Sequence, residues 1–161
     1  MTQPYIIAAL ALAFLATATA AEACQSPRVV DGDTLDCDGV RVRLWGIDAF
    51  EKRQLCQNAD GSNWGCGEDA QIALQTMTNG QVVVSVNHGH DRYGRTVARC
   101  SVGGSDLGSL MVQLGYALDW PKYSNSYYAA EQDAAMVAKV GAWAGMFDRP
   151  WDWRAQRRHP K

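Results

Sequence analysis

The stretch from Arg28 to Ile47 limits the possible folds of this 161-residue chain more than any other, because it alternates short strand-like runs with turn signals. The Asp-Gly pairs at 31–32 and 38–39 are typical of tight turns, and the residues around them alternate between apolar and polar side chains. Such alternation indicates half-buried strands. The pattern predicts a three-stranded meander made of residues 28–30, 34–37 and 40–47.

From Glu68 onward the apolar spacing changes from that of a strand to that of a helix. Ala70, Ala73, Leu74 and Met77 recur at helical intervals, and Asn79-Gly80 ends the run. Residues 81–86 and 95–102 then predict two further strands. A second helix is expected to begin at a Ser105 cap and to end at Gly115, and a third is expected over about 126–140.

The charge balance excludes a strongly basic surface as the source of ligand binding. The chain carries 15 basic and 17 acidic residues, a formal net charge of −2. The basic residues cluster only in the tail, at Arg154, Arg157, Arg158 and Lys161. We expect this tail to be a solvated end, with weak help in nucleic-acid binding as the alternative. Any phosphate affinity must then come from a few placed residues and a metal.

The first twenty residues have the pattern of a secretory signal peptide. Residues 5–16 are apolar, no charge precedes Glu22, and Ala18-Thr19-Ala20 resembles a small-x-small cleavage site. An uncleaved membrane anchor is the alternative, but the apolar run is short for a span of about 20 residues. We therefore expect a signal peptide over residues 1–20 and one domain over residues 21–161. The mature protein would be secreted or periplasmic and would have no stable membrane association.

Three short blocks hold the residues of a cation-assisted phosphodiesterase. They are Asp31-Gly32-Asp33-Thr34, Arg43 to Glu51, and Asp91-Arg92-Tyr93-Gly94-Arg95. Carboxylates at Asp33 and Asp48 could bind a hard cation, Glu51 could act as a base, and arginines could bind a phosphate. Each block alone has the composition of an ordinary turn. Only together do they indicate phosphodiester cleavage.

In order, spacing and residue type the blocks resemble the staphylococcal nuclease (thermonuclease) family, from about Val29 to about Trp143. The resemblance implies an α+β, β-rich fold, a five-stranded Greek-key barrel of the OB type with three packed α-helices. It also implies Ca²⁺-dependent hydrolysis of DNA and RNA, with single strands preferred and with 3′-phosphate and 5′-hydroxyl ends. We expect the protein to be a monomer.

Residue by residue, the resemblance assigns three kinds of role. The Ca²⁺ ligands would be Asp33, Asp48 and the carbonyl of Ala49. The catalytic residues would be Arg43, Glu51 and Arg95, with Glu51 as the general base. Contacts to substrate would come from Tyr93, Tyr123 and Arg92. The chain departs from the family pattern at Phe50, where the family usually has Pro, and at Pro121, where an aromatic residue is expected.

All five cysteines follow the predicted cleavage site, and an oxidising compartment favours pairing. Cys56 and Cys66 enclose a polar segment with little other means of ordering itself, so they form the first expected disulfide. Cys37 and Cys100 would both point inward in a barrel like that of the family, and form the second. Cys24 would then be unpaired.

Other functions fit the sequence less well. The main rival to an enzyme is an exported OB domain that binds nucleic acid, or another ligand, without cutting it. His88 and His90 could indicate a transition metal, but a solvated or supporting role is more consistent with the lack of a third ligand nearby. Trp143, Trp151 and Trp153 are expected to anchor the C-terminal segment, rather than to stack on bases.

Overall fold

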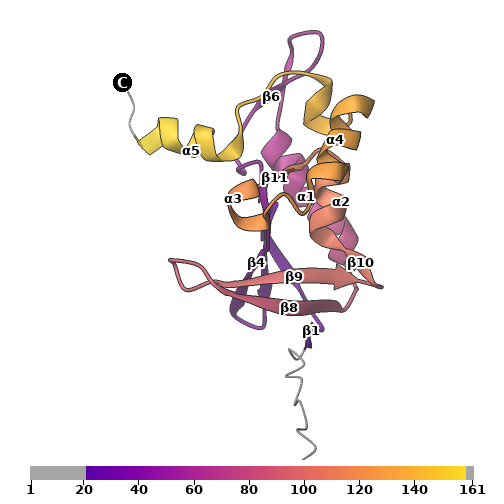
Figure 1. Cartoon of the computed structure of the whole chain (residues 1–161), viewed down its shortest axis with the longest axis vertical. Coiled ribbons are helices and arrows are strands. Elements are labelled where there is room, and N and C mark those ends of the chain that lie inside the picture. Colours follow the sequence, from indigo (N-terminus) through magenta and orange to yellow (C-terminus); the bar gives the residue numbers. More distant parts are fainter. Residues whose placement is uncertain (1–20, 159–161) are drawn as a thin grey trace, which may run out of the picture.

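The predicted meander forms as β2, β3 and β4, and a curled sheet continues from it through β9 and β8 (Figure 1). The computed structural model describes residues 21–158, so the predicted signal peptide at 1–20 lies outside the described residues. The sheet contains β1 (Ala21–Cys24), β2 (Arg28–Asp31), β3 (Thr34–Cys37), β4 (Val40–Leu44), β8 (Val83–His90), β9 (Thr96–Val102) and β10 (Ser105–Asp106). Strands β4 and β9 run parallel, and the other neighbouring pairs are antiparallel.

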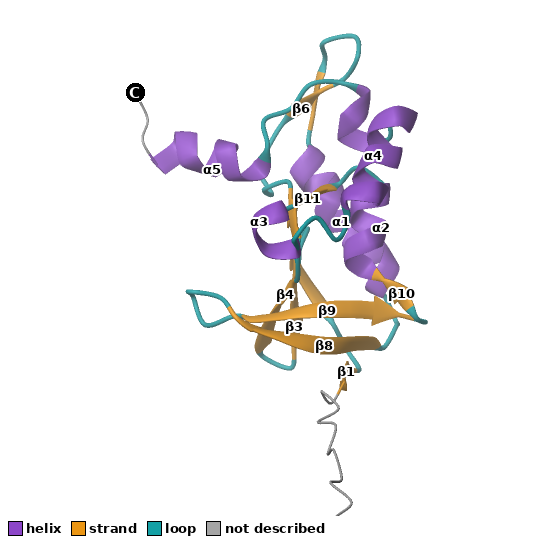
Figure 2. Ribbon diagram, in the orientation of Figure 1, coloured by secondary structure: helices purple, strands orange, loops and turns teal. Residues whose placement is uncertain are grey.

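The three predicted helices are present, and three short helical segments accompany them (Figure 2). The predicted ones are α1 (Cys66–Thr78), α2 (Leu107–Gln113) and α4 (Ala129–Ala138). The additional segments are α3 (Pro121–Ser124), the 3₁₀ turn η1 (Gly141–Ala144) and α5 (Pro150–Arg158). The α+β fold of the OB type is therefore confirmed, with more helix at the C-terminal end than the sequence pattern indicated.

Two helix boundaries differ from those expected. The residue that caps α2 is Asp106 instead of Ser105, because its carboxylate accepts hydrogen bonds from the backbone N–H groups of Gly108 and Ser109. Ser105 instead pairs with Val102 in β10. The third helix begins at Ala129 and not at about residue 126, since Asn125 and Ser126 have left-handed backbone conformations with φ of 53° and 62°.

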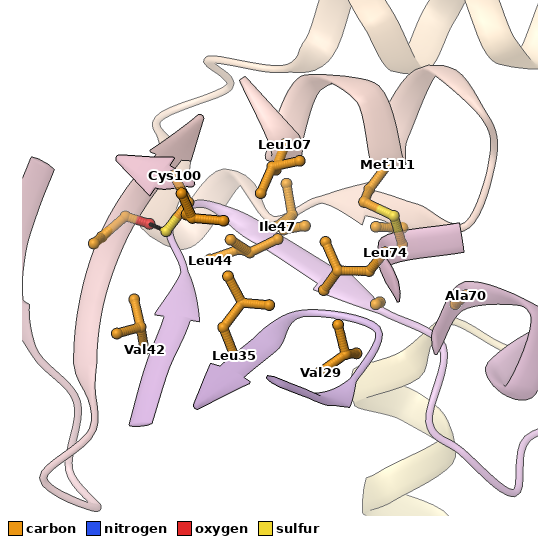
Figure 3. Close-up of a cluster of buried hydrophobic side chains, with 14 of the residues drawn as sticks. Val29, Leu35, Val42, Leu44, Ile47, Ala70, Leu74, Cys100, Leu107 and Met111 are labelled. Atoms are coloured by element: carbon orange, nitrogen blue, oxygen red, sulfur yellow. Dashed lines mark hydrogen bonds between the residues drawn. The ribbon is translucent and has the colours of Figure 1, made fainter. Parts of the chain in front are cut away.

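The main core lies between the sheet and the helices α1 and α2 (Figure 3). Leu35 and Leu44 from the sheet face Leu107 and Met111 from α2, and Leu74 enters from α1. All five side chains are buried. Burial of side chains of this size stabilises the fold by about 1.5–3 kcal/mol each.

A second, smaller core holds the end of the chain against the barrel. Phe50, Leu118 and Ala142 are buried in it, and Trp143 and Trp151 pack at its edge. Two short two-stranded sheets border this core, formed by β5 (Ile47–Ala49) with β11 (Ala117–Asp119) and by β6 (Cys56–Gln57) with β7 (Asn63–Trp64). The expectation that the late tryptophans anchor the C-terminal segment is confirmed for Trp143 and Trp151.

One of the two predicted disulfides forms. Cys56 is bonded to Cys66, at the N-terminus of α1. The predicted pair of Cys37 with Cys100 is wrong: Cys37 is bonded to Cys24, and Cys100 is a free, buried thiol.

The sheet order explains this difference. Cys37 and Cys100 lie on β3 and β9, and β4 runs between these strands. Two strand spacings amount to about 10 Å, more than the roughly 7 Å between Cα atoms that a disulfide can bridge. Cys24 comes close by the path of the chain instead: it ends β1, which the sequence did not predict, just before β2, where Arg28 is opposite Asp36. Its Cα lies 5.5 Å from that of Cys37.

None of the helices within residues 21–158 is both long enough and apolar enough to cross a lipid bilayer.

The Cys56 to Cys66 crosslink is expected to act mainly on stability. Replacing both residues by Ser should destabilise the fold by about 2–3 kcal/mol, because a loop of this length would be freed in the unfolded chain. The melting temperature should fall by roughly 10 °C in thermal unfolding followed by circular dichroism. The variant Ala59→Ser, which changes an exposed residue inside the same loop but no crosslink, is the control. A double variant that melts with the wild type would contradict this role.

Candidate active site

A cavity of about 930 Å³ opens between the tip of the β8–β9 hairpin and helix α5. Both elements project to the same side of the molecule, with α3 between them (Figure 1). Eight of the nine side chains or backbone groups that the sequence assigned to a site line this cavity: Asp33, Arg43, Ala49, Glu51, Arg92, Tyr93, Arg95 and Tyr123. The ninth, Asp48, is bonded to the lining residue Arg43. The structure therefore brings the three sequence blocks to one place.

Asp33 is fixed by the tight connection between β2 and β3. Its backbone N–H donates to Asp31 Oδ1, and its own Oδ1 accepts from the Thr34 hydroxyl at 2.9 Å. The backbone N–H of Ala49 lies 3.3 Å from Asp33 Oδ2. Strand β5 therefore contacts the same carboxylate that the turn presents. Only 4% of Asp33 is exposed.

Arg43 joins the two predicted metal-binding carboxylates. Its Nη1 donates to Asp33 Oδ1 at 2.8 Å, and its Nη2 donates to Asp48 Oδ1 at 2.7 Å. Arg43 lies on β4 opposite Thr34, so the pairing of β3 with β4 sets its position. Its fork of parallel N–H donors suits two carboxylates at once.

The carboxylate cluster is short of positive charge. Burial raises the pKa of Asp48 to about 6, although hydrogen bonds from Arg154 act in the opposite direction. Burial and the neighbouring Asp33 carboxylate raise the pKa of Asp31 to about 7. When all are ionised, the four carboxylates of Asp31, Asp33, Asp48 and Glu51 face two guanidinium groups. The cluster is then two positive charges short.

These residues fit the divalent cation that the family resemblance implies. Carboxylate oxygens are the ligands that Ca²⁺ prefers, and Asp33 and Asp48 offer them next to the backbone of Ala49. Within residues 21–158, no three acidic, His or Cys side chains form a complete metal cage. Backbone carbonyls and water would therefore supply the other ligands, as they commonly do for Ca²⁺.

Glu51 stands at the cavity wall, held by a short turn. Its backbone N–H donates to Gln54 Oε1, and its carbonyl accepts from the Gln54 N–H. Phe50, the departure from the family pattern, is buried against Phe147 with ring centroids 5.2 Å apart. The carboxylate of Glu51 shares the Arg154 guanidinium with Asp48, so Phe50 does not carry Glu51 away from the cluster.

Two other residues fix this turn. Gln54 is fully buried, and its Nε2 donates to the carbonyl of Asp148 at 2.6 Å, which connects the turn to the segment before α5. Gly67, in the first turn of α1, leaves no room for a side chain, since a Cβ there would overlap the Glu51 carbonyl oxygen. Helix α1 therefore packs directly on the backbone of Glu51.

The hairpin between β8 and β9 brings the remaining predicted residues to the cavity. Arg95 Nε donates to Asp91 Oδ2 at 2.7 Å, so this guanidinium is paired within its own turn and not with the carboxylate cluster. The Arg92 guanidinium lies over the ring of Tyr93, 4.7 Å from its centroid. Tyr93 itself is 65% exposed. The Arg95 guanidinium lies 5.7 Å from the same centroid, so the hairpin tip presents two cations beside one exposed ring.

Aromatic side chains form the wall opposite the hairpin. Tyr123 packs edge-on against Trp120 with ring centroids 4.5 Å apart, and Trp120 stacks on Trp151 of α5 at 5.7 Å. Pro121, the second departure from the family pattern, begins α3. The aromatic residue at this place in the wall is therefore its neighbour, Trp120.

Arg154 was not among the predicted site residues, and the prediction that it belongs to a solvated tail is wrong. Arg154 donates to both Asp48 oxygens, at 3.0 and 2.7 Å, and to Glu51 Oε1 at 2.6 Å. Burial disfavours its charged form, but these hydrogen bonds raise the pKa of Arg154 above its usual value. The amphipathic spacing of Trp151, Arg154 and Arg158, which all line the cavity, was the available signal.

Comparison with known proteins places the chain in one protein family. The family model described as "Staphylococcal nuclease homologue" matches residues 41–145. A succinoglycan biosynthesis protein, ExoI, from Rhizobium meliloti is 32% identical over 117 residues, which cover 71% of this chain and 61% of that protein. An uncharacterized endonuclease from Haemophilus influenzae is 30% identical over 142 residues, covering 84% of this chain and 74% of that protein. The Staphylococcal-like nuclease CAN1 of Arabidopsis thaliana is 29% identical over 120 residues, covering 73% and 34%.

The contact between Gly67 and Glu51 predicts a sensitive position far from the cavity opening. Gly67→Ala should displace the Glu51 turn and destabilise the fold by about 1–3 kcal/mol, because the backbone of the turn must move. The nearby Gly65→Ala is the control, since its added Cβ would lie 3.6 Å from the nearest atom. Thermal unfolding of both variants tests this. Equal melting temperatures for the two variants would show that the close approach has no energetic weight.

Proposed function

The chain belongs to the staphylococcal nuclease family, and we propose that it is a calcium-dependent nuclease that hydrolyses phosphodiester bonds in DNA and RNA. Family membership and nuclease relatives support the nuclease function itself. The calcium dependence, the two substrates and the 3′-phosphate and 5′-hydroxyl products are the parts that we propose.

One observation carries the proposal: two buried carboxylates, an arginine between them and the Glu51 carboxylate lie together at one cavity wall. Burying Asp33 and Asp48 is unfavourable unless cations compensate them, so the cluster has a cost that stability alone does not explain. Phosphodiester hydrolysis needs this combination of groups: a base, a cation site and donors to phosphate oxygens.

We assign each residue one task. Glu51, with 35% of its side chain exposed, accepts the proton of the attacking water. Arg43 and Arg95 donate hydrogen bonds to the phosphate oxygens, where negative charge grows in the transition state. Calcium bound by Asp33, Asp48 and the Ala49 carbonyl would supply a Lewis acid for a non-bridging oxygen. The Arg95 guanidinium is paired with Asp91 in the hairpin turn. It must therefore release Asp91 when it binds the phosphate.

Substrate bases would stack on exposed aromatic rings. Tyr93 and Tyr123 are 65% and 53% exposed and line the cavity from the hairpin and from α3. Stacking on aromatic rings tolerates any base and needs bases that are free to unstack. We therefore propose that single strands are preferred, that Arg92 adds a phosphate contact, and that sequence is not read.

We further propose that the protein acts after export, in the periplasm or outside the cell. Its two disulfides support this, because such bonds persist mainly in oxidising compartments. We also propose that the protein acts as a monomer.

Metal dependence should follow the buried carboxylates. Asp48→Asn removes one of the negative ligands without changing its size, so calcium affinity and cleavage of a labelled oligonucleotide should fall together. Isothermal titration with Ca²⁺ and cleavage assays measure the two effects. Asp152→Asn, an exposed residue of α5 outside the cavity, is the control. Full cleavage in excess chelator would refute the calcium assignment.

Glu51→Gln gives the sharpest test of the chemistry. An amide of almost the same size cannot accept the proton of water, so kcat should fall by about 10²–10⁴. Oligonucleotide binding should change much less, because the phosphate contacts remain. Arg95→Ala should weaken both cleavage and binding, since its guanidinium acts before and in the transition state.

Single-turnover cleavage and equilibrium binding of a short single-stranded oligonucleotide in Ca²⁺ separate these effects. Glu68→Gln, an exposed carboxylate of α1 outside the cavity, should behave like the wild type. A Glu51→Gln variant that cleaves at nearly the wild-type rate removes Glu51 from the mechanism. A wild-type protein that binds the oligonucleotide in Ca²⁺ but never cuts it would instead be the non-catalytic binding module.

A further inference from the structure

The proposed reaction uses the carboxylates of Asp48 and Glu51, one to bind the metal and the other to accept a proton. Helix α5 places a positively charged side chain against both. One guanidinium, that of Arg154, contacts both oxygens of Asp48 and one oxygen of Glu51. The matched family segment ends at residue 145, before α5 begins at Pro150. Arg154 therefore lies outside the matched segment.

The bonds to Asp48 leave little capacity for another cation. Asp48 is fully buried, and its two oxygens already accept three hydrogen bonds from guanidinium groups: one from Arg43 and two from Arg154. A carboxylate offers about four lone-pair directions. A divalent cation bound to Asp48 would need an oxygen at about 2.3–2.6 Å. It would also meet a like charge at close range.

Of the two arginines, Arg154 is the one able to leave. Arg43 lies on β4, between β3 and β9 in the sheet, and is also bonded to Asp33. Arg154 belongs to the last described helix, whose C-terminal end points away from the barrel (Figure 1). Its side chain is 23% exposed, compared with 14% for Arg43. A change of side-chain conformation would take it into the cavity.

We propose that Arg154 is a positioning residue that acts as an internal counter-ion: it occupies Asp48 and Glu51 in the cation-free protein and leaves Asp48 when the divalent cation binds. This inference rests on the proposed calcium site. Its consequence is that metal binding also frees Glu51, because the same guanidinium holds both carboxylates. The base would then become available only in the metal-loaded protein.

Terbium luminescence tests the exchange without any substrate. Tb³⁺ replaces Ca²⁺ at oxygen sites and emits when a nearby indole is excited. Trp120 is such an indole, because its ring centroid lies 5.6 Å from the Arg154 Cζ and 6.0 Å from the Arg43 Cζ. Titration of the full chain with Tb³⁺, followed by displacement with Ca²⁺, gives the affinity for each ion.

Removing the competing charge should strengthen binding. Arg154→Ala is expected to bind Tb³⁺ and Ca²⁺ on the order of tenfold more tightly than the wild type. Arg154→Lys should lie between the two, since an ammonium keeps the charge but not the forked donors. Arg157→Ala is the matched control: it removes the same charge from the same helix, but Arg157 stacks on Trp153 at 4.0 Å instead of contacting the carboxylates. Its affinity should change by less than about threefold.

The sign of the effect separates competition from simple structural support. If Arg154 only held α5 in place, its loss would disorder the site and weaken metal binding. Unchanged or weaker Tb³⁺ binding by a folded Arg154→Ala variant, with folding checked by circular dichroism, would therefore overturn the inference. Asp48→Asn tests the proposed calcium site separately. If that variant binds Tb³⁺ as tightly as the wild type, Asp48 is not a ligand of the ion. The calcium site is then wrong, and the inference fails with it.

Discussion

The bridge that Arg43 makes between Asp33 and Asp48 is the interaction on which the site depends. It joins the turn after β2 to strand β5 through a residue of β4, so three separate segments meet at one guanidinium. Both carboxylates are almost fully buried, and leaving either one without a cation would be strongly unfavourable. The barrel therefore presents its carboxylates in a fixed geometry.

Local signals predicted the strands and turns that carry the site, while the barrel and the residue roles came from the resemblance to the nuclease family. Asp-Gly turns and alternating residues define β2, β3 and β4, and the tight turn at Asp91-Arg92-Tyr93-Gly94-Arg95 brings its own residues to the cavity. The cap at Asp106 was missed by one residue. Neighbouring Ser and Asp are both good caps, and the hydrogen bonds that decide between them are seen only in the folded chain.

What the sequence did not predict depends on contacts between distant segments. Cys24 lies beside Cys37 because the chain enters β2 four residues later, with Arg28 opposite Asp36, and nothing local marks residues 21–24 as a strand. Arg154 lies 106 residues after Asp48, in a stretch whose charges are typical of a solvated tail. Burial of Trp151 against Trp120 brings this stretch back to the cavity, and hydrophobic spacing alone does not reveal which surface receives it.

Gln54 gives the molecule a feature that can be recognised in other sequences. Its carboxamide is bonded both to the Glu51 backbone and to the Asp148 carbonyl, which lies 94 residues away. A buried carboxamide destabilises the fold unless both of its hydrogen-bond partners are present, because an unpaired polar group has lost its bonds to water. In related chains, Gln at this position should therefore occur together with a C-terminal segment that returns to the barrel, and an apolar residue there should occur together with a shorter chain. One position near the middle of a relative's sequence would thus report on how its end is folded.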